Sequence, residues 1–260
     1  MNCHHLRRTW SAVWGLLWAV VAWGVLPLAP AEAQTPAARQ WTLPNGLRVV
    51  CQSNPTTATV VVCGFVRVTV LHELRVAPGV RQLTNMVLAH GGSREQLIRQ
   101  IAARVEGALA ADYAEIMVSA AAEDLEPCLD ILAGVLYAPQ LDAQVLETQR
   151  MLLLRELAAR SESPAERAFD LAHARLYPEL RSKAWLLGDP ETISHLTLEQ
   201  VRGFHAAHYL PNATVISVSG AVSCERTREV VGERFGRLLP GGLPEPVPIT
   251  GAPAGDRVQL

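Results

Sequence analysis

The run of β-branched residues between Thr57 and Val70 constrains the fold more than any other feature of the sequence. Six valines occupy it with few interruptions: Val60, Val61, Val62, Val66, Val68 and Val70. Continuous apolar runs, as opposed to alternating ones, are typical of strands that are buried on both faces. The sequence therefore predicts a strand here with both faces covered.

Turn signals and helical periodicities surround this strand. Asn45-Gly46 predicts a turn within the extended segment 41–50, and residues 53–56 predict a second turn. Residues 109–121 predict two short strands, and residues 213–219 predict another. Helices are predicted over 80–90, 93–106, 123–138, 142–160, 163–177, 196–208 and 223–235. Because the strands come as hairpins and the helices in runs, we expect an α+β fold, with a mainly antiparallel sheet and helices packed on one face.

Particular residues set the predicted helix boundaries. Ser93-x-x-Gln96 and Thr197-x-x-Gln200 both have capping-box spacing, with a hydroxyl residue three positions before a glutamine. Leucines mark the inward faces of the two longest helices; these are Leu125, Leu129, Leu132 and Leu136 in one, and Leu146, Leu152, Leu153 and Leu157 in the other. We expect these leucines to lie in the core.

The first 33 residues are typical of a secretory signal peptide. Arg7 and Arg8 precede an apolar run from Ala12 to Leu28, and Ala31-Glu32-Ala33 follows as an A-x-A cleavage site. A retained membrane anchor is the alternative, although the apolar run is short for a span. We therefore predict export to the periplasm or outside the cell, with no membrane span after cleavage. Residues 34–240 form the predicted domain, and residues 241–260 a Pro/Gly-rich linker or the truncated start of a second domain.

The charge and the cysteines limit the function classes. The net charge of −2 gives no support for nucleic-acid binding. Four cysteines follow the signal segment: Cys51, Cys63, Cys128 and Cys224. They allow three complete disulfide pairings, between which the sequence cannot choose. None has C-x-x-C spacing, so single buried thiols are the favoured interpretation.

An ordered set of short motifs spans the chain from Trp41 to about Leu239. Among them are Leu43-x-Asn45-Gly46-Leu47, a glutamate (Glu73) before a Gly-led helix, Arg155-Glu156-Leu157, and Tyr209-x-Pro211-Asn212. In this order and spacing the motifs resemble the insulinase/pitrilysin (mitochondrial processing peptidase-like) metallopeptidase family. The resemblance implies the processing-peptidase/LuxS-like metallohydrolase fold, with zinc as the family cofactor.

Members of that family carry H-x-x-E-H on the first helix. Its two histidines lie on one helical face and ligate zinc, its glutamate takes a proton from zinc-bound water, and a distal glutamate completes the site. Aligned on Gly79 and Met86, this chain has Arg81, Thr84 and Asn85 at the three positions. Glu156 matches the distal ligand. One carboxylate cannot hold zinc, so we predict no metal, no cofactor and no catalysis by this chain alone.

The resemblance leaves two interpretations of Arg81 and Glu156 open. Arg81 could pair with Glu156 where the metal would lie, or both could be ordinary solvated charges. A relocated zinc site is disfavoured, because His72-Glu73 has no second histidine at zincin spacing, while His90 and His173 stand alone. His205 and His208 are three residues apart and could chelate in principle.

Other chemistries have less support. The sequence contains no G-x-S-x-G nucleophile motif. Asp124, Glu126 and Asp130 are interpreted as the N-terminal charges and exposed face of a helix.

Three functions remain. The first is a non-catalytic, zinc-less subunit or domain that helps a zinc-bearing partner to bind peptides, as the family's paired domains imply. The second is an active zinc-dependent metalloendopeptidase with unrecognised ligands, and the third is a peptide-binding remnant without a partner. Residues 109–115 match the edge at which the family binds substrate strands, although a plain core-covering hairpin is the alternative there. A single domain that pairs with another half should also expose an apolar face.

Overall fold

The computed structural model describes residues 37–246, apart from residue 75 and residues 178–186. The predicted signal peptide and most of the predicted linker lie outside this described part. None of the described helices is long and apolar enough to cross a membrane.

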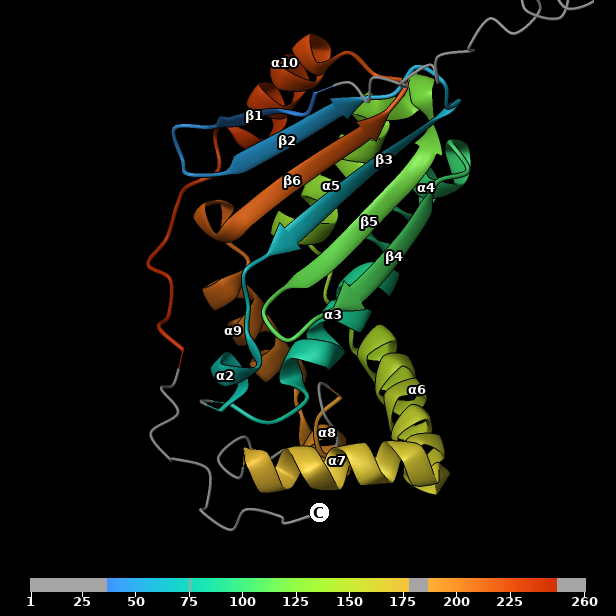
Figure 1. Ribbon diagram of the computed structural model, residues 1–260, viewed down its shortest axis with the longest axis vertical. Helices are drawn as coiled ribbons and strands as arrows, with labels where there is room; N and C mark the ends of the chain where they lie inside the picture. The colour runs from blue at the N-terminus through green and yellow to red at the C-terminus, as the bar shows by residue number, and fades with distance from the viewer. Residues whose placement is uncertain (1–36, 75, 178–186, 247–260) are drawn as a thin grey trace, which may run out of the picture. The chain divides into compact units, whose positions relative to one another are not determined.

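A six-stranded sheet forms the centre of the fold, in the order β1-β2-β6-β3-β5-β4 (Figure 1). Its strands are β1 (Arg39–Thr42), β2 (Arg48–Ser53), β3 (Thr59–Val66), β4 (Arg104–Leu109), β5 (Ala114–Ala121) and β6 (Thr214–Gly220). Neighbouring strands are antiparallel except β2 and β6, which are parallel. On β3, Val62 lies opposite Val118 of β5 and Val218 of β6, so the valine-rich segment does form an inner strand.

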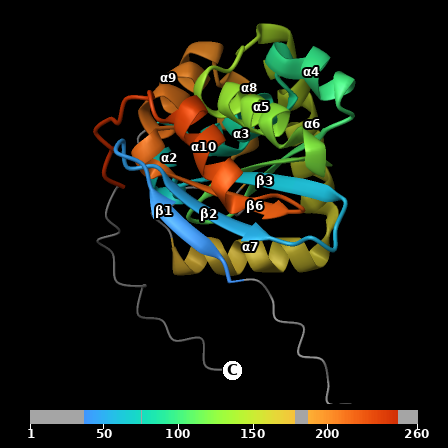
Figure 2. The ribbon, with the colours of Figure 1, turned by 90° about the horizontal axis from the view of Figure 1, so that it is seen from above.

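Helices cover one face of this sheet, as the view from above shows (Figure 2). The described helices are α2 (Val70–Glu73), α3 (Val80–His90), α4 (Glu95–Gln100), α5 (Leu125–Tyr137), α6 (Ala143–Glu162), α7 (Pro164–Leu176), α8 (Pro190–His195), α9 (Leu198–His208) and α10 (Cys224–Phe235). Of these, α7 does not belong to the covering layer and lies apart from it, against α6 (Figure 2). Short 3-10 turns lie at Gly92–Arg94, Ala122–Asp124 and Pro211–Ala213. The predicted α+β architecture is confirmed, and so is the capping box of α9 between Thr197 and Gln200.

The sheet is more exposed than its sequence predicts. Val60, Val62 and Val66 of β3 are fully buried under the helices. Val61 and Cys63, on the opposite face, are only half-buried. The expectation that both faces are covered was therefore wrong. The valine run is continuous, but its burial alternates with the pleat because the described helices pack on one side.

Other corrections concern element boundaries. The helix expected over 93–106 ends at Gln100, and its N-cap is Arg94, not Ser93. Ala102 then adopts a positive φ of 49°, which stops the helix before β4 begins at Arg104. Leu152 is 46% exposed, because it lies on the outer side of α6, whereas its neighbour Leu153 is buried. The short helices α2 and α8 had no clear periodicity and were not predicted.

A disulfide joins Cys51 of β2 to Cys224 of α10. The interpretation of all four cysteines as single thiols was therefore wrong for this pair, whose Cα atoms lie 5.7 Å apart. Cys63 and Cys128 are free thiols. Burial raises the pKa of Cys63 to about 12 and that of Cys128 to about 11, so both stay protonated at neutral pH.

We predict that the Cys51–Cys224 bond stabilises the fold strongly, because it closes a loop with a sequence separation of 173 residues. Replacing both cysteines by alanine should lower the free energy of unfolding by about 2–4 kcal/mol. Urea unfolding with and without a reductant measures this effect. The control is Cys63→Ala, in which the reductant should still destabilise the fold. An unchanged midpoint in the double variant would show that the bond does not form.

Candidate functional site

Helix α3 carries the residues predicted to replace the zinc motif. It starts after Gly79, whose φ of 96° lies in the left-handed region that favours glycine. A side chain at this position would also come within 2.6 Å of Ile193. Arg81, Thr84 and Asn85 are all buried, so Arg81 is not a solvated helix charge.

Arg81 forms a buried ion pair with Glu73 of α2. Its Nε donates to Glu73 Oε1 at 3.0 Å, and its Nη1 donates to the carbonyl oxygens of Val68 at 2.9 Å and Ala110 at 2.6 Å. The second carboxylate oxygen of Glu73 accepts from the Gly79 amide at 2.6 Å. The predicted pairing of Arg81 with Glu156 was therefore wrong. Glu156 is exposed on α6, whereas the guanidinium points towards α2.

The environment of Glu73 has two opposing effects on its charge. Burial raises the pKa of Glu73, while the Arg81 guanidinium and the Gly79 amide act to lower it. Removing two charges from water is costly, and the cost is recovered only where each charge is paired and hydrogen-bonded. The pair holds α2, the start of α3 and the β4–β5 hairpin together.

Thr84 and Asn85 also serve the fold. Thr84 Oγ1 donates to the Val80 carbonyl one turn earlier, at 2.7 Å. Asn85 Nδ2 donates to the Ala108 carbonyl of β4 at 2.8 Å. These two side chains therefore fix α3 internally and to the sheet.

A hollow of about 640 Å³ lies beside α3, β4, α6 and α7, and it contains Glu156. Its lining is Gln82, Gly107, Ala108, Leu109, Glu156, Arg160, Ala165, Glu166, Phe169 and Leu187. The α3 residue that shares this hollow with Glu156 is Gln82, not Arg81. The structure therefore favours a motif register one residue later than the sequence alignment, with Gln82, Asn85 and Met86 at the H-x-x-E-H positions. Gln82 and Met86 lie four residues apart, on one helical face.

The residues in the shifted motif register do not fit zinc. The amides of Gln82 and Asn85, the thioether of Met86 and the Glu156 carboxylate lack the imidazole or thiolate donors that zinc prefers. Across the described segments, no three His, Cys, Asp or Glu side chains are grouped so as to hold a metal ion. We therefore derive no zinc-dependent step for this site.

The remaining histidines and acids have structural partners. His205 Nε2 contacts the Leu136 carbonyl at 2.8 Å and His208 Nδ1 the Phe204 carbonyl at 2.8 Å, so the two do not chelate together. Burial lowers the pKa of both rings. Asp130 pairs with Arg234 of α10 at 2.5 Å, and Glu126 pairs with Arg226 of the same helix.

Strand β4 provides a free backbone edge next to the hollow (Figure 1). The Ala110 amide donates to the Tyr113 carbonyl at 2.9 Å, so these two opposed residues form a hydrogen-bonded pair of the hairpin. Hydrogen-bonded and non-hydrogen-bonded pairs alternate along two antiparallel strands. The amide and carbonyl groups of Val105, Gly107 and Leu109 therefore point away from β5. The predicted edge segment 109–115 is thus mostly the hairpin turn, and the usable edge lies earlier, in β4.

We predict that replacing both Arg81 and Glu73 lowers the free energy of unfolding less than replacing Glu73 alone. Glu73→Leu leaves a buried, unpaired guanidinium and should cost about 3–5 kcal/mol of unfolding free energy. The double variant Arg81→Met with Glu73→Leu should recover a large part of that loss. Urea titrations of the two single variants and the double variant measure the coupling, and strictly additive losses would contradict a direct pair.

A zinc site should be recoverable in the shifted register. The triple variant Gln82→His, Asn85→Glu and Met86→His should bind about one zinc ion with the existing Glu156, measured by metal analysis. Adding Glu156→Ala should weaken that binding. The alternative set Arg81→His, Thr84→Glu and Asn85→His breaks the buried ion pair and should be destabilised and metal-free. Zinc bound by the alternative set but not by the first would restore the original register.

Comparisons with known proteins match the sequence in two stretches. Residues 48–189 match the family model described as Insulinase (Peptidase family M16), and residues 195–258 match the Peptidase M16 inactive domain. The second match runs through residues predicted to form the linker.

The relatives are about twice as long as this chain. It is 31% identical over 198 residues to the mitochondrial cytochrome b-c1 complex subunit 1 of Caenorhabditis elegans, covering 74% of this chain and 42% of that protein. An uncharacterized zinc protease of Mycobacterium tuberculosis is 29% identical over 229 residues, which cover 84% of this chain and 51% of that protein.

Solved structures share the fold. A Pseudomonas fluorescens structure described as a peptidase M16 inactive domain superposes with a TM-score of 0.70 at 21% identity, covering 81% of this chain and 54% of that one. The family match spans more than half of the sequence, and the fold and the glycine-led helix α3 agree with it. The chain belongs to the insulinase family, peptidase family M16.

Proposed function

We propose that this chain is a non-catalytic, zinc-less insulinase-family subunit that binds extended peptides and assists a zinc-bearing partner. The observation that carries the proposal is the 640 Å³ hollow beside the β4 edge, which Glu156 and Gln82 line, and at which the described residues include no group of three metal-ligating side chains. The site keeps the means to hold a peptide and lacks the means to cleave it.

The β4 edge supplies the binding chemistry. The outward amide and carbonyl groups of Gly107 and Leu109 can pair with an added strand, and both residues line the hollow. Phe169 and Leu187 give the hollow apolar walls for peptide side chains. Backbone pairing makes such binding tolerant of sequence, while the apolar walls favour large side chains.

Helix α7 supports the need for a partner. None of its thirteen residues is buried, and Leu171 is 69% exposed. Met151 and Leu152 of α6 extend the exposed apolar surface, together with Phe169, Leu176 and Tyr177. Surfaces of this kind mark sites of association. Since the relatives are about twice as long, we infer that a second half, supplied by another chain or domain, covers α7.

We also propose that the chain is exported. The Cys51–Cys224 disulfide supports this location, because disulfides persist in oxidising compartments. The two other functions stay open to test: an active zinc metalloendopeptidase with unrecognised ligands, and a peptide-binding remnant without a partner.

Binding of a fluorescent ten-residue unstructured peptide, measured by anisotropy, tests the proposal. The purified chain should bind the peptide equally with and without a chelator and should leave it intact. Two peptides should be compared, one methylated at its odd-numbered amides and the other at its even-numbered amides. Only one of the two should bind more weakly, because only every second amide of an added strand faces β4. Chelator-sensitive cleavage by the purified chain would instead establish the metalloendopeptidase.

Co-expression with an insulinase-family chain containing intact H-x-x-E-H tests the partner role. The two chains should co-purify, and Leu171→Glu with Leu176→Glu should abolish the association while peptide binding persists. Leu239→Glu is the matched control, because Leu239 is 83% exposed and lies outside α6 and α7. Peptide binding without co-purification would favour the remnant.

A further inference from the structure

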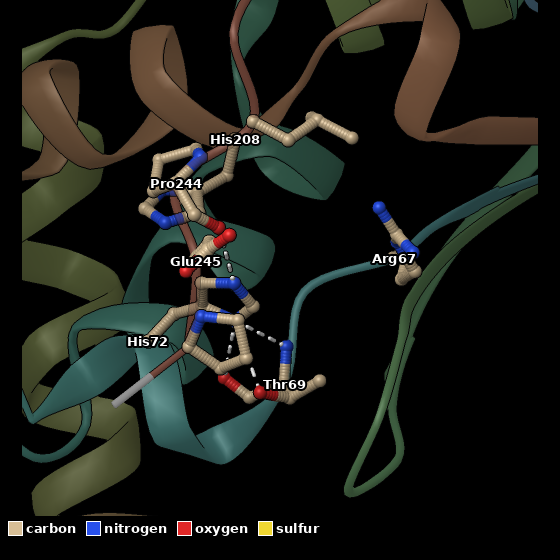
Figure 3. A pocket seen from close by; sticks show the side chains of 8 residues that line it. Arg67, Thr69, His72, His208, Pro244 and Glu245 are labelled. Atoms are coloured by element: carbon tan, nitrogen blue, oxygen red, sulfur yellow. Dashed lines mark hydrogen bonds between the residues drawn. The ribbon is translucent and has the colours of Figure 1, made fainter. Parts of the chain in front are cut away.

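A second cavity lies away from the β4 edge and holds about 550 Å³ (Figure 3). Arg67 and Thr69, which follow β3, line it together with His72 of α2 and His208 of α9. Residues 243–246 form its remaining wall. The volume falls within the range of about 300–1,000 Å³ that is typical of small-molecule sites.

The 243–246 segment is tied to the domain at two points. Asn212 Nδ2 donates to the Gly241 carbonyl at 2.8 Å, and the Gly241 amide donates back to Asn212 Oδ1 at 3.2 Å. The Thr69 amide donates to His72 Nδ1 at 2.9 Å, so the proton of this ring lies on Nε2, 3.1 Å from the Pro244 carbonyl. The cavity wall is therefore held in place by specific hydrogen bonds.

His208 contributes an unused acceptor to the cavity. Its ring is 7% exposed, and Nδ1 donates to the Phe204 carbonyl at 2.8 Å, which leaves Nε2 with a bare lone pair. Nothing in the described part of the chain hydrogen-bonds to that nitrogen. Burial and the nearby His72 lower the pKa of His208, so the ring stays neutral near pH 7 and can accept an N–H.

Charges of opposite sign line the cavity without meeting. The Arg67 guanidinium and the Glu245 carboxylate lie on different sides of it (Figure 3), and neither has an ionic partner among the described residues. A simple anion would be repelled by Glu245 and a simple cation by Arg67. A ligand that carries both charges complements both walls.

We propose that this cavity binds a short zwitterionic peptide, with its carboxylate on Arg67, its ammonium group on Glu245 and an N–H on His208 Nε2. The site does not depend on the proposed function at β4. Because Glu245 lies on the 243–246 segment and Arg67 follows β3, a bound ligand also fastens that segment to the domain.

Calorimetric titration of the full chain with alanyl-alanine at pH 7.5 tests the site. Saturable binding is expected, and N-acetyl-alanyl-alanine and alanyl-alaninamide, which each lack one charge, should bind about tenfold more weakly. No saturation up to about 20 mM, a concentration well above a millimolar Kd, overturns the proposal. Equal affinity for the charged and capped forms also overturns it.

Variants identify which charge meets which residue. Arg67→Gln should weaken the binding of alanyl-alanine about tenfold and leave the binding of alanyl-alaninamide, which has no carboxylate, unaffected. Glu245→Gln should also weaken the binding of alanyl-alanine about tenfold, but should leave the binding of N-acetyl-alanyl-alanine, which has no ammonium group, unaffected. Arg48→Gln and Glu199→Gln are matched controls at exposed positions outside the cavity. Dipeptide binding at the β4 edge would be insensitive to Arg67 and Glu245, so loss of this site and loss of β4 binding are separable.

Discussion

The buried ion pair between Arg81 and Glu73 is the interaction on which the site region depends. A single guanidinium bonds to a carboxylate on α2, to the Val68 carbonyl before it and to the Ala110 carbonyl of the β4–β5 hairpin. One of these segments, α2, is only four residues long. A charge this deeply buried demands all its partners at once, which makes the arrangement specific even where its net stabilisation is small.

Helix α3 presents neighbouring residues to different surroundings. Successive residues of an α-helix point about 100° apart, so Arg81 and its neighbour Gln82 face different surroundings. Arg81 turns into the protein, whereas Gln82 reaches the hollow that holds Glu156. The two faces of α3 therefore carry different surroundings: a buried ion pair on one, and part of the lining of the hollow on the other.

Much of this fold follows from the sequence, because glycines, capping residues and leucine spacing act locally. Gly79, Thr197-Gln200 and the inward leucines of α5 behave as predicted. The errors come from contacts distant in sequence. A disulfide between Cys51 and Cys224 and the choice of Glu73 over Glu156 as the partner of Arg81 depend on three-dimensional proximity. The register of the degenerate motif also depends on proximity, because only the folded chain shows that Gln82 and not Arg81 shares a hollow with Glu156.

Helix α7 has a consequence for how tightly any partner can bind. It is anchored to α6 mainly where Arg160 forms two hydrogen bonds with Asp170, at 3.0 and 2.8 Å, and it has no buried residue of its own. A helix of this length is marginally stable without packing. A partner that covered this helix would therefore add the burial that α7 does not find among the described residues.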